Sequence, residues 1–354
     1  MLSAAEFREI VSGRRRGAKA ALWRGLFRAA ETPYSLAVRW RNRQYDRGRK
    51  PSERVGVPVV SVGNLTLGGT GKTPLVEWLA RWLRARGVRV ALVSRGYGAD
   101  AGARNDEALE LEQKLPDVPH VQNPDRVAAA RMAIAEFDSQ FILLDDAFQH
   151  RRIHRDLDIV VIDALEPFGF GHVFPRGMLR EPLAGLRRAD AVVLSRADLV
   201  SGAERERIRA IVTRHAPGAL WIEAAHVPRG LRNASGVEAA ADSLAGQPVA
   251  AFCGLGNPAS FRATLNRLGY DVVAQREYPD HFPYPREEVE SLVQWAGGLT
   301  VRGVVCTHKD LVKLGIDRLG PHPLWAVVVG LEMTVGAAEL ESRLAALCAA
   351  IPAA

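Results

Sequence analysis

The amino-acid sequence predicts an α/β protein with two α/β/α domains built on mainly parallel sheets, preceded by a basic amphipathic helix. Three observations support this prediction. Short apolar runs alternate with helical patterns past residue 55, a glycine-rich turn follows the first of these runs, and basic residues concentrate in the first 50 positions. Such alternation is typical of parallel strands covered by helices on both faces. A chain of 354 residues, 47% of them apolar, can bury the cores of two domains.

Each predicted strand is a short run of apolar and β-branched residues, and each predicted helix has apolar residues at three- and four-residue spacing. The strands are Val57–Val62, Arg89–Ser94, Phe141–Asp145, Asp158–Ile162, Ala191–Ser195, Val249–Cys253, Gly303–Thr307 and Ala326–Val329. The helices are Leu75–Arg86, Arg126–Phe137, Glu204–His215 and Arg286–Ala296. In this order they form βαβ units, which predict parallel sheets.

Composition indicates where the domains meet. The stretch 227–247 is rich in Gly, Ala, Ser and Asn and has weak periodicity, so we expect a linker there. The predicted organisation is a basic segment over 1–50, a first α/β domain over 51–226 and a second α/β domain over 248–354.

Residues 1–50 carry 13 Lys and Arg against four acidic residues, which gives them +9 in a chain of net charge +7. A helix there with a Trp, Phe and Leu face and an arginine-rich rim suits an anionic membrane surface. Two alternatives stay open: a helix packed on the domain with a solvated basic side, and a nucleic-acid-binding arm. The arm is disfavoured because no aromatic-interleaved basic patch continues into the body. The predicted apolar face consists of Leu22, Trp23, Leu26, Phe27 and Ala30.

Other features exclude several classes of protein. The three cysteines are too few and too scattered for a disulfide framework, and no Cys-x-x-Cys pair indicates zinc, which fits a reducing compartment. Charged residues occupy the start of the chain, where a secretory signal needs an apolar region. No run of 18 uncharged apolar residues predicts a membrane-spanning helix.

A glycine-rich turn ending in Gly-Lys-Thr follows the first predicted strand, just where a helix begins. Glycines let backbone amides surround a phosphate, the lysine reaches the β- and γ-phosphates, and the threonine hydroxyl ligates Mg²⁺. The positive end of the helix adds to the same anion site. One departure is Thr66, which stands where the first glycine of such loops is usual. The predicted ATP-binding residues are Gly68, Gly69, Thr70, Gly71, Lys72 and Thr73.

Two adjacent carboxylates, Asp145 and Asp146, end the apolar strand at 141–145. A P-loop fold needs a carboxylate at the carboxyl end of the neighbouring strand to hold Mg²⁺ or its water shell. Their like charges favour a cation nearby. The predicted metal ligands are therefore Thr73, Asp145 and Asp146.

The glycine-rich turn and further motifs follow one another in a fixed order: Asn64–Pro74, Ser94-Arg-Gly-Tyr-Gly98, Pro124-Asp-Arg126, Asp145–His150, Gly177–Pro182, Pro279-Asp280-His281 and Thr307-His-Lys-Asp310. This order resembles the tetraacyldisaccharide 4′-kinase family, which acts in lipid A biosynthesis. The resemblance implies an ATP- and Mg²⁺-dependent peripheral enzyme at the cytoplasmic face of the inner membrane. Its acceptor would be an acylated glucosamine disaccharide 1-phosphate, phosphorylated at the 4′-hydroxyl to give lipid IVA.

The resemblance also assigns roles to single residues. It matches the catalytic Asp of the family to Asp106 and the partner His to His281, a pair suited to taking the proton of a sugar hydroxyl. Lys72, Arg180 and Glu181 complete the implied catalytic set. The implied substrate-binding residues are Asn64, Arg95, Gln149 and His150.

Three departures from the family pattern bear on these assignments. Asn105 and Ala147 replace glycines, and the segment before Asn105 is short, so Asp100 is a rival base to Asp106. His281 as a capped loop residue and Arg180 as a structural ion-pair residue stay open.

One pattern favours a different class of protein. Ser195-Arg-Ala-Asp198 stands where GTP-binding proteins read guanine, so a P-loop GTPase or other NTPase at a membrane is the alternative function. A non-enzymatic membrane-tethering module leaves the P-loop and the Asp pair unexplained. Lys309-Asp310 is interpreted as a turn ion pair outside the site.

Overall fold

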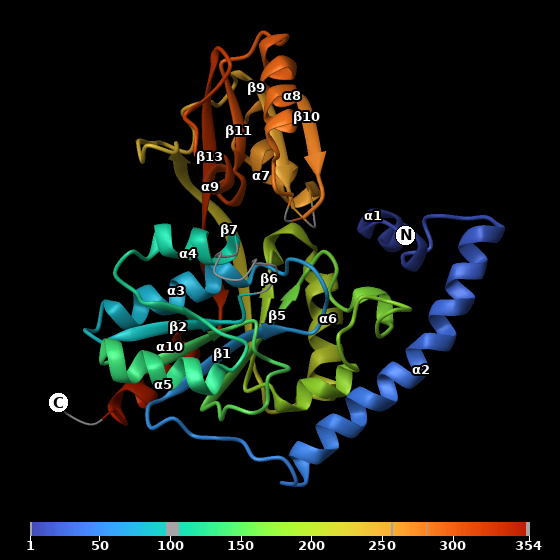
Figure 1. Ribbon diagram of the computed structural model, residues 1–354, viewed down its shortest axis with the longest axis vertical. Helices are drawn as coiled ribbons and strands as arrows, with labels where there is room; N and C mark the ends of the chain where they lie inside the picture. Colours follow the sequence, from blue (N-terminus) through green and yellow to red (C-terminus); the bar gives the residue numbers. More distant parts are fainter. Residues whose placement is uncertain (1, 97–105, 256–257, 281, 352–354) are drawn as a thin grey trace. The chain divides into compact units, whose positions relative to one another are not determined.

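The structure is a computed structural model that describes residues 2–96, 106–255, 258–280 and 282–351 (Figure 1). Contacts divide the chain into two compact units. The first contains Met1–Ala99, Leu115–Ala225 and Glu332–Ala354, and the second contains Asp100–Lys114 and His226–Leu331. The predicted α/β class with mainly parallel sheets is confirmed.

The first unit is built on parallel strands in the order β7-β6-β5-β1-β4-β2-β3. Parallel strands end at one edge of a sheet, so the loops that follow β1, β2, β4 and β6 gather there. The strands are β1 (Val59–Asn64), β2 (Val90–Ser94), β3 (His120–Gln122), β4 (Phe141–Asp145), β5 (Leu157–Asp163), β6 (Ala191–Ser195) and β7 (Leu220–Arg232), whose residues from His226 onward belong to the second unit.

Helices cover both faces of this sheet. Buried residues of α5 pack with Ile142 and Leu144 of β4, and those of α6 pack with Val160 and Leu194 on the same face. Helix α3 lies in the crossover from β1 to β2, which runs across the sheet in the opposite direction to the β3–β4 crossover that contains α5, so right-handed crossovers place α3 on the other face. The helices of this unit after β1 are α3 (Lys72–Arg84), α5 (Arg126–Phe137), α6 (Gly202–His215), α10 (Ala337–Ala349) and the short 3₁₀ turns η1 (Gly169–Gly171), η2 (Leu183–Arg188) and η3 (Ala197–Leu199).

One glycine of β1 fixes how closely the chain after β4 approaches it. A Cβ added at Gly63 would lie 2.6 Å from the Cβ and 2.7 Å from the backbone nitrogen of Phe148. The Phe148 side chain is fully buried, so the segment after the Asp pair packs directly on β1.

Gly63→Ala should therefore destabilise the protein by roughly 1–3 kcal/mol, because backbone atoms must move to admit the methyl group. Thermal unfolding measures the change. Gly25→Ala is the matched control, because Gly25 lies inside a helix with open space around it. This substitution should leave the stability of the protein unchanged or raise it slightly. Equal melting temperatures for Gly63→Ala and wild type would contradict the packing described.

The second unit has its own parallel strands in the order β10-β9-β11-β13. Residues of α8 pack with Phe252 and Cys306, and residues of α7 pack with Ala251 and Cys253 on the opposite face. The residues 227–247, predicted as a linker, contain the end of β7 and strand β8. The elements are α4 (Asp106–Lys114), β8 (Glu238–Ala239), β9 (Pro248–Gly254), α7 (Pro258–Arg267), β10 (Asp271–Tyr278), α8 (Arg286–Gly297), β11 (Gly303–Thr307), α9 (His308–Leu314), β12 (Arg318–Leu319) and β13 (His322–Val335), whose residues from Glu332 onward belong to the first unit.

Two helices precede β1, α1 (Ala4–Val11) and α2 (Ala18–Asp46). Trp23 and Phe27 of α2 contact each other at 5.5 Å between ring centroids, and Phe27 also contacts Phe7 of α1 at 5.3 Å. The predicted apolar face is thus divided. Trp23 and Phe27 are half-buried in these ring contacts, whereas Leu22 and Leu26 are exposed. Among the described residues, no helix has the length and apolar character needed to cross a membrane.

Candidate functional site

The glycine-rich turn joins β1 to α3 at the carboxyl edge of the first sheet. Gly68 and Gly71 have φ angles of 101° and 79°, which residues with a Cβ rarely adopt. The helix starts at Lys72, directly after Gly71, so its first backbone amides lie at the end of the turn. This arrangement is a phosphate cradle of the kind that P-loops form.

Two side chains, one from the end of β1 and one from the end of β6, hold the turn in shape. The buried Asn64 side chain donates from Nδ2 to Thr70 Oγ1 at 3.2 Å. The Ser195 hydroxyl at the end of β6 donates to the Thr70 carbonyl at 2.7 Å. Asn64, predicted to bind substrate, is thus engaged with the turn. The sequence pattern indicates Ser195 only as part of a guanine-reading motif and does not predict its contact with Thr70.

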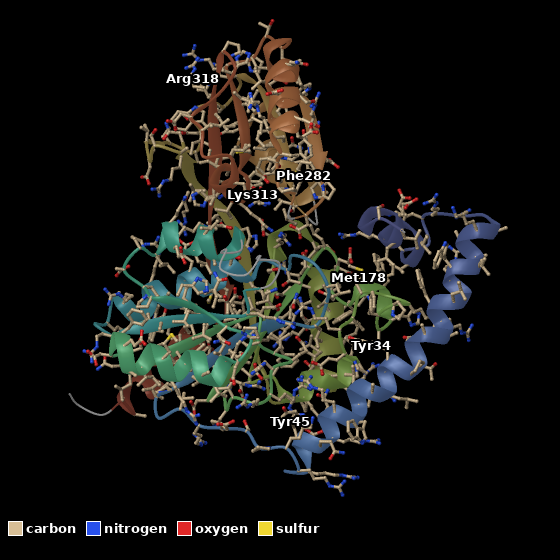
Figure 2. All side chains as sticks on the ribbon, in the orientation of Figure 1. Tyr34, Tyr45, Met178, Phe282, Lys313 and Arg318 are labelled. Carbon is tan, nitrogen blue, oxygen red and sulfur yellow. The ribbon has the colours of Figure 1, made fainter. Side chains whose placement is uncertain are left out.

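The turn also pairs with the loop that follows η1. Thr66 forms an antiparallel bridge with Leu179, and the Leu67 amide donates to the Met178 carbonyl at 2.7 Å (Figure 2 labels Met178). The Arg180 amide donates to the Leu65 carbonyl, also at 2.7 Å. Extended backbone suits a β-branched residue, which explains why threonine can replace the usual first glycine at position 66.

Lys72, Asp146 and Arg180 meet beside the turn. Lys72 Nζ lies 3.4 Å from Asp146 Oδ1, and Arg180 Nη1 donates to both Asp146 carboxylate oxygens at 2.8 and 2.9 Å. Asp146 has φ of 50°, an uncommon conformation that functional sites often contain. Burial disfavours its charge, but the Lys72 ammonium and the Arg180 guanidinium outweigh burial and hold the Asp146 pKa well below its usual value.

Asp145 is the last residue of β4, pairs in register with Val62 of β1, and is 4% exposed. Thr73 is the second residue of α3, next to Lys72. Carboxylate and hydroxyl oxygens are the protein ligands that Mg²⁺ prefers. Thr73, Asp145 and Asp146 therefore offer a donor set that fits Mg²⁺ bound to nucleotide phosphates.

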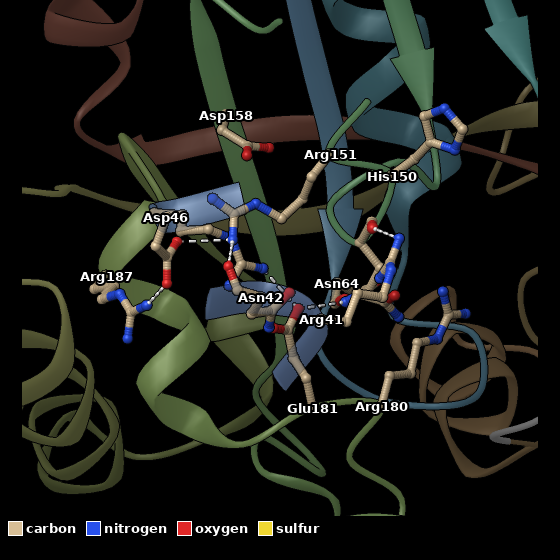
Figure 3. Close-up of polar contacts among 12 residues, drawn as sticks. Arg41, Asn42, Asp46, Asn64, His150, Arg151, Asp158, Arg180, Glu181 and Arg187 are labelled. Atoms are coloured by element: carbon tan, nitrogen blue, oxygen red, sulfur yellow. Dashed lines mark hydrogen bonds and ion pairs between the residues drawn. The ribbon is translucent and has the colours of Figure 1, made fainter. Parts of the chain in front are cut away.

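Glu181 is 1% exposed and accepts hydrogen bonds from three side chains (Figure 3). The donors are Asn42 Nδ2 at 2.9 Å, Gln149 Nε2 at 3.1 Å and Arg188 Nη2 at 2.7 Å. Gln149 Nε2 also donates to the Asn64 carbonyl at 2.9 Å. Glu181 and Gln149 are thus brought close to the P-loop, but these contacts are with protein groups.

His150 is partly buried among arginines. Burial, followed by the charges of Arg126, Arg155 and Arg41, lowers its pKa to about 4. Arg126 is 3% exposed, and its own pKa is lowered by burial and then by the charge of Arg95, so these two cations lie close together. Arg126 belongs to the Pro-Asp-Arg motif, but the sequence pattern assigns it no role in the site.

The lowered pKa of His150 predicts how the stability of the folded protein depends on pH. The folded protein favours the neutral ring, whereas the unfolded chain binds a proton near pH 6.5, so this contribution is complete above pH 6.5 and is lost as pH falls toward 4. His150→Gln should therefore lose less melting temperature between pH 7 and pH 4.5 than wild type. Thermal unfolding at both pH values measures the difference, and parallel losses would contradict it.

The remaining catalytic candidates belong to the second unit. Asp106 is the first residue of α4, whereas Asp100 and His281 lie outside the described residues. Lys309 Nζ donates to Asp280 Oδ1 at 2.9 Å, so Lys309 contacts the residue before His281. Asp310 is fully buried and accepts from the Gly254 amide and the Tyr284 hydroxyl.

Comparisons with known proteins agree with the arrangement of these motifs. A sequence model of the family described as tetraacyldisaccharide-1-P 4′-kinase matches residues 23–349. The chain belongs to this family. The tetraacyldisaccharide 4′-kinase of Anaeromyxobacter dehalogenans (strain 2CP-C) is 41% identical over 335 residues, which cover 89% of this chain and 88% of the relative. That of Geobacter sulfurreducens is 36% identical over 340 residues, with 91% and 93% covered.

A solved structure of a family member is also similar. LpxK from Aquifex aeolicus, crystallised in complex with ATP, has a TM-score of 0.71 and 28% sequence identity to this chain. The match covers 92% of this chain and 99% of that protein. The family and the fold class predicted from the sequence are thus confirmed.

Proposed function

We propose that this chain transfers the γ-phosphoryl group of ATP, with Mg²⁺, to the 4′-hydroxyl of the tetraacyldisaccharide 1-phosphate precursor of lipid A, giving lipid IVA. The observation that carries the proposal is the contact of Lys72, Asp146 and Arg180 beside the P-loop of a family member. Phosphoryl transfer depends mainly on positioned charges around the transferring group, and these residues supply both signs.

Each residue has a distinct task in this proposal. The Gly68–Gly71 turn binds the phosphates, and Lys72 stabilises negative charge on the transferring group. Thr73, Asp145 and Asp146 would hold Mg²⁺, which would supply positive charge to the phosphate oxygens. Arg180 positions the Asp146 carboxylate and adds a cation beside the transferring group.

Asp106 and His281 are proposed as the pair that removes the proton of the acceptor hydroxyl. Arg95 and His150 are proposed to contact the acceptor, because the charge of Arg95 acts on the buried Arg126 and the pKa of the half-buried His150 is lowered to about 4.

Transfer of label from ATP to purified lipid A disaccharide tests the function directly. We expect ATP consumption that depends on the glycolipid. GTP turnover independent of lipid would favour the GTPase alternative, although Ser195 and Arg196 of its motif are engaged elsewhere, Ser195 with Thr70 and Arg196 with Asp163 at 2.5 Å.

We also propose that α2 rests on the anionic cytoplasmic face of the inner membrane. Four large apolar residues lie within one stripe of this helix by their spacing, and they are 51–65% exposed. The basic charge of residues 1–50 is complementary to anionic headgroups. The residues of this stripe are Leu22, Leu26, Leu36 and Trp40.

Replacing all four stripe residues with serine should weaken sedimentation with anionic vesicles at least about tenfold, since burying each large apolar side chain contributes roughly 1.5–3 kcal/mol. Wild-type binding should also fall as NaCl rises, because salt screens the basic residues. Serine at four exposed apolar positions outside the helix, Met132, Phe137, Val237 and Val273, is the matched control. Equal sedimentation of the two variants would place the membrane contact elsewhere.

A further inference from the structure

The side of α2 opposite the exposed stripe is bonded to the machinery around the P-loop. Asn42 donates to Glu181, and Arg41 Nη2 donates to the Gln149 carbonyl at 2.9 Å (Figure 3). Tyr34, labelled on α2 in Figure 2, donates from its hydroxyl to the Arg180 carbonyl at 3.2 Å. Three residues of one helix thus contact three residues of the predicted site.

A second set of contacts fixes the end of the helix. Asp46 pairs with Arg151 at 2.8 Å and with Arg187, and Arg151 also donates to the Asn42 carbonyl at 2.9 Å. The backbone of Asn42 is therefore held while its side chain reaches Glu181. This makes the Asn42 amide a fixed donor and not a mobile surface group.

From Glu181 the contacts continue to the phosphate cradle by two routes. One runs through Gln149 to the Asn64 carbonyl, and the Asn64 side chain contacts Thr70 in the turn. The other is covalent, because Glu181 follows Arg180, whose guanidinium binds Asp146. The Glu181 carboxylate is buried, and both of its oxygens accept hydrogen bonds from protein side chains. Glu181 is therefore better suited to positioning its neighbours than to contacting substrate.

We propose that Asn42 and Glu181 are positioning residues, which make α2 part of the phosphate-transfer site as well as its membrane helix. This inference rests on the proposed function. A charged, buried hub of this kind keeps its geometry only while every donor is present. A displacement of about 1 Å at reacting groups can lower a rate on the order of 10²-fold.

A swap of hydrogen-bond polarity tests the contact. Asn42→Asp places a second carboxylate against Glu181 and should lower kcat at least about tenfold, with a smaller rise in KM for ATP. Adding Glu181→Gln restores one donor and one acceptor, because the introduced amide can donate to the new carboxylate while its oxygen still accepts from Gln149 and Arg188. We expect the double variant to recover most of kcat. Glu31→Gln is the control, since Glu31 ties α2 to Val173 and Arg176 without reaching Glu181.

Calorimetric binding of MgATP to each variant separates this inference from the proposed function, because it needs no acceptor. We expect Asn42→Asp to bind MgATP at least about threefold more weakly than wild type. The double variant should recover wild-type affinity, and the affinity of Glu31→Gln should be unchanged. Wild-type kcat and ATP affinity in Asn42→Asp would overturn the positioning role. Wild-type enzyme that binds MgATP but transfers nothing to the disaccharide would overturn the proposed function, and the positioning role would then be decided by the ATP affinities.

Discussion

Replacing Lys72 with alanine should lower phosphoryl transfer on the order of 10²–10³-fold, because it removes a preorganised charge at the transferring phosphate. Lys72 is 9% exposed, and its ammonium faces Asp146 at 3.4 Å, so its position is set before nucleotide binds. Its loss leaves Arg180 as the neighbouring cation of Asp146, and we expect the pKa of Asp146 to rise from its lowered value. Initial rates at saturating ATP and acceptor measure the effect.

The fold should survive this change, because α3 is held by Leu75, Leu79 and Leu83, all fully buried. A circular dichroism spectrum and a melting temperature close to wild type would show this. Lys50→Ala is the control, since Lys50 is exposed and lies over the Tyr45 ring at the end of α2. Half of wild-type activity in Lys72→Ala would contradict the assignment of the P-loop.

The P-loop and its strand could be predicted because their signals are local in sequence. A strand, a turn that needs positive φ and a helix start occupy adjacent residues, and each leaves its own residue preference. The same holds for Asp145, which ends β4 as predicted. The shifts at β1, predicted as Val57–Val62 and found as Val59–Asn64, reflect pairing with neighbouring strands that local propensity does not determine.

The partners of Glu181 could not be predicted, because they come from distant parts of the chain. Asn42 is 139 residues away and Gln149 is 32 away, and no spacing rule connects them. The family resemblance implies a catalytic role for Glu181, whereas its burial and its donors favour positioning. Trp23 and Phe27 show the same limit: helical periodicity places them on an apolar face, but only the fold brings Phe7 against Phe27.

Contacts within the second unit hold residues next to the proposed Asp106–His281 pair, and the sequence did not predict these contacts either. Lys309 of α9 holds Asp280, the residue before His281, and His308 lies 3.8 Å from Glu110 of α4, the helix that begins at Asp106. Burial opposes the charge of Glu110, but Lys114 at 2.9 Å and His308 outweigh it and lower its pKa to about 2. Consecutive residues of α9 thus contact the residue before His281 and the helix that begins at Asp106.

Asp106→Ala and His281→Ala should each lower kcat on the order of 10²–10⁴-fold, the contribution that a positioned general base typically makes. The affinity for ATP should change little, because neither residue belongs to the P-loop. The double variant should be about as slow as the worse single variant, since two groups that act as a unit lose their joint contribution with the first replacement. Steady-state kinetics of the four proteins, with labelled ATP and the lipid disaccharide, measure this.

Asp100→Ala is the matched control, because Asp100 is the rival carboxylate shortly before Asp106 in the sequence. We expect it to keep nearly wild-type kcat. An inactive Asp100→Ala beside an active Asp106→Ala would move the base to Asp100, and clean multiplication of the two single losses would show that Asp106 and His281 act separately. The proton of the sugar hydroxyl must leave as the phosphoryl group arrives, so loss of the true base should also flatten the acidic side of the kcat profile against pH.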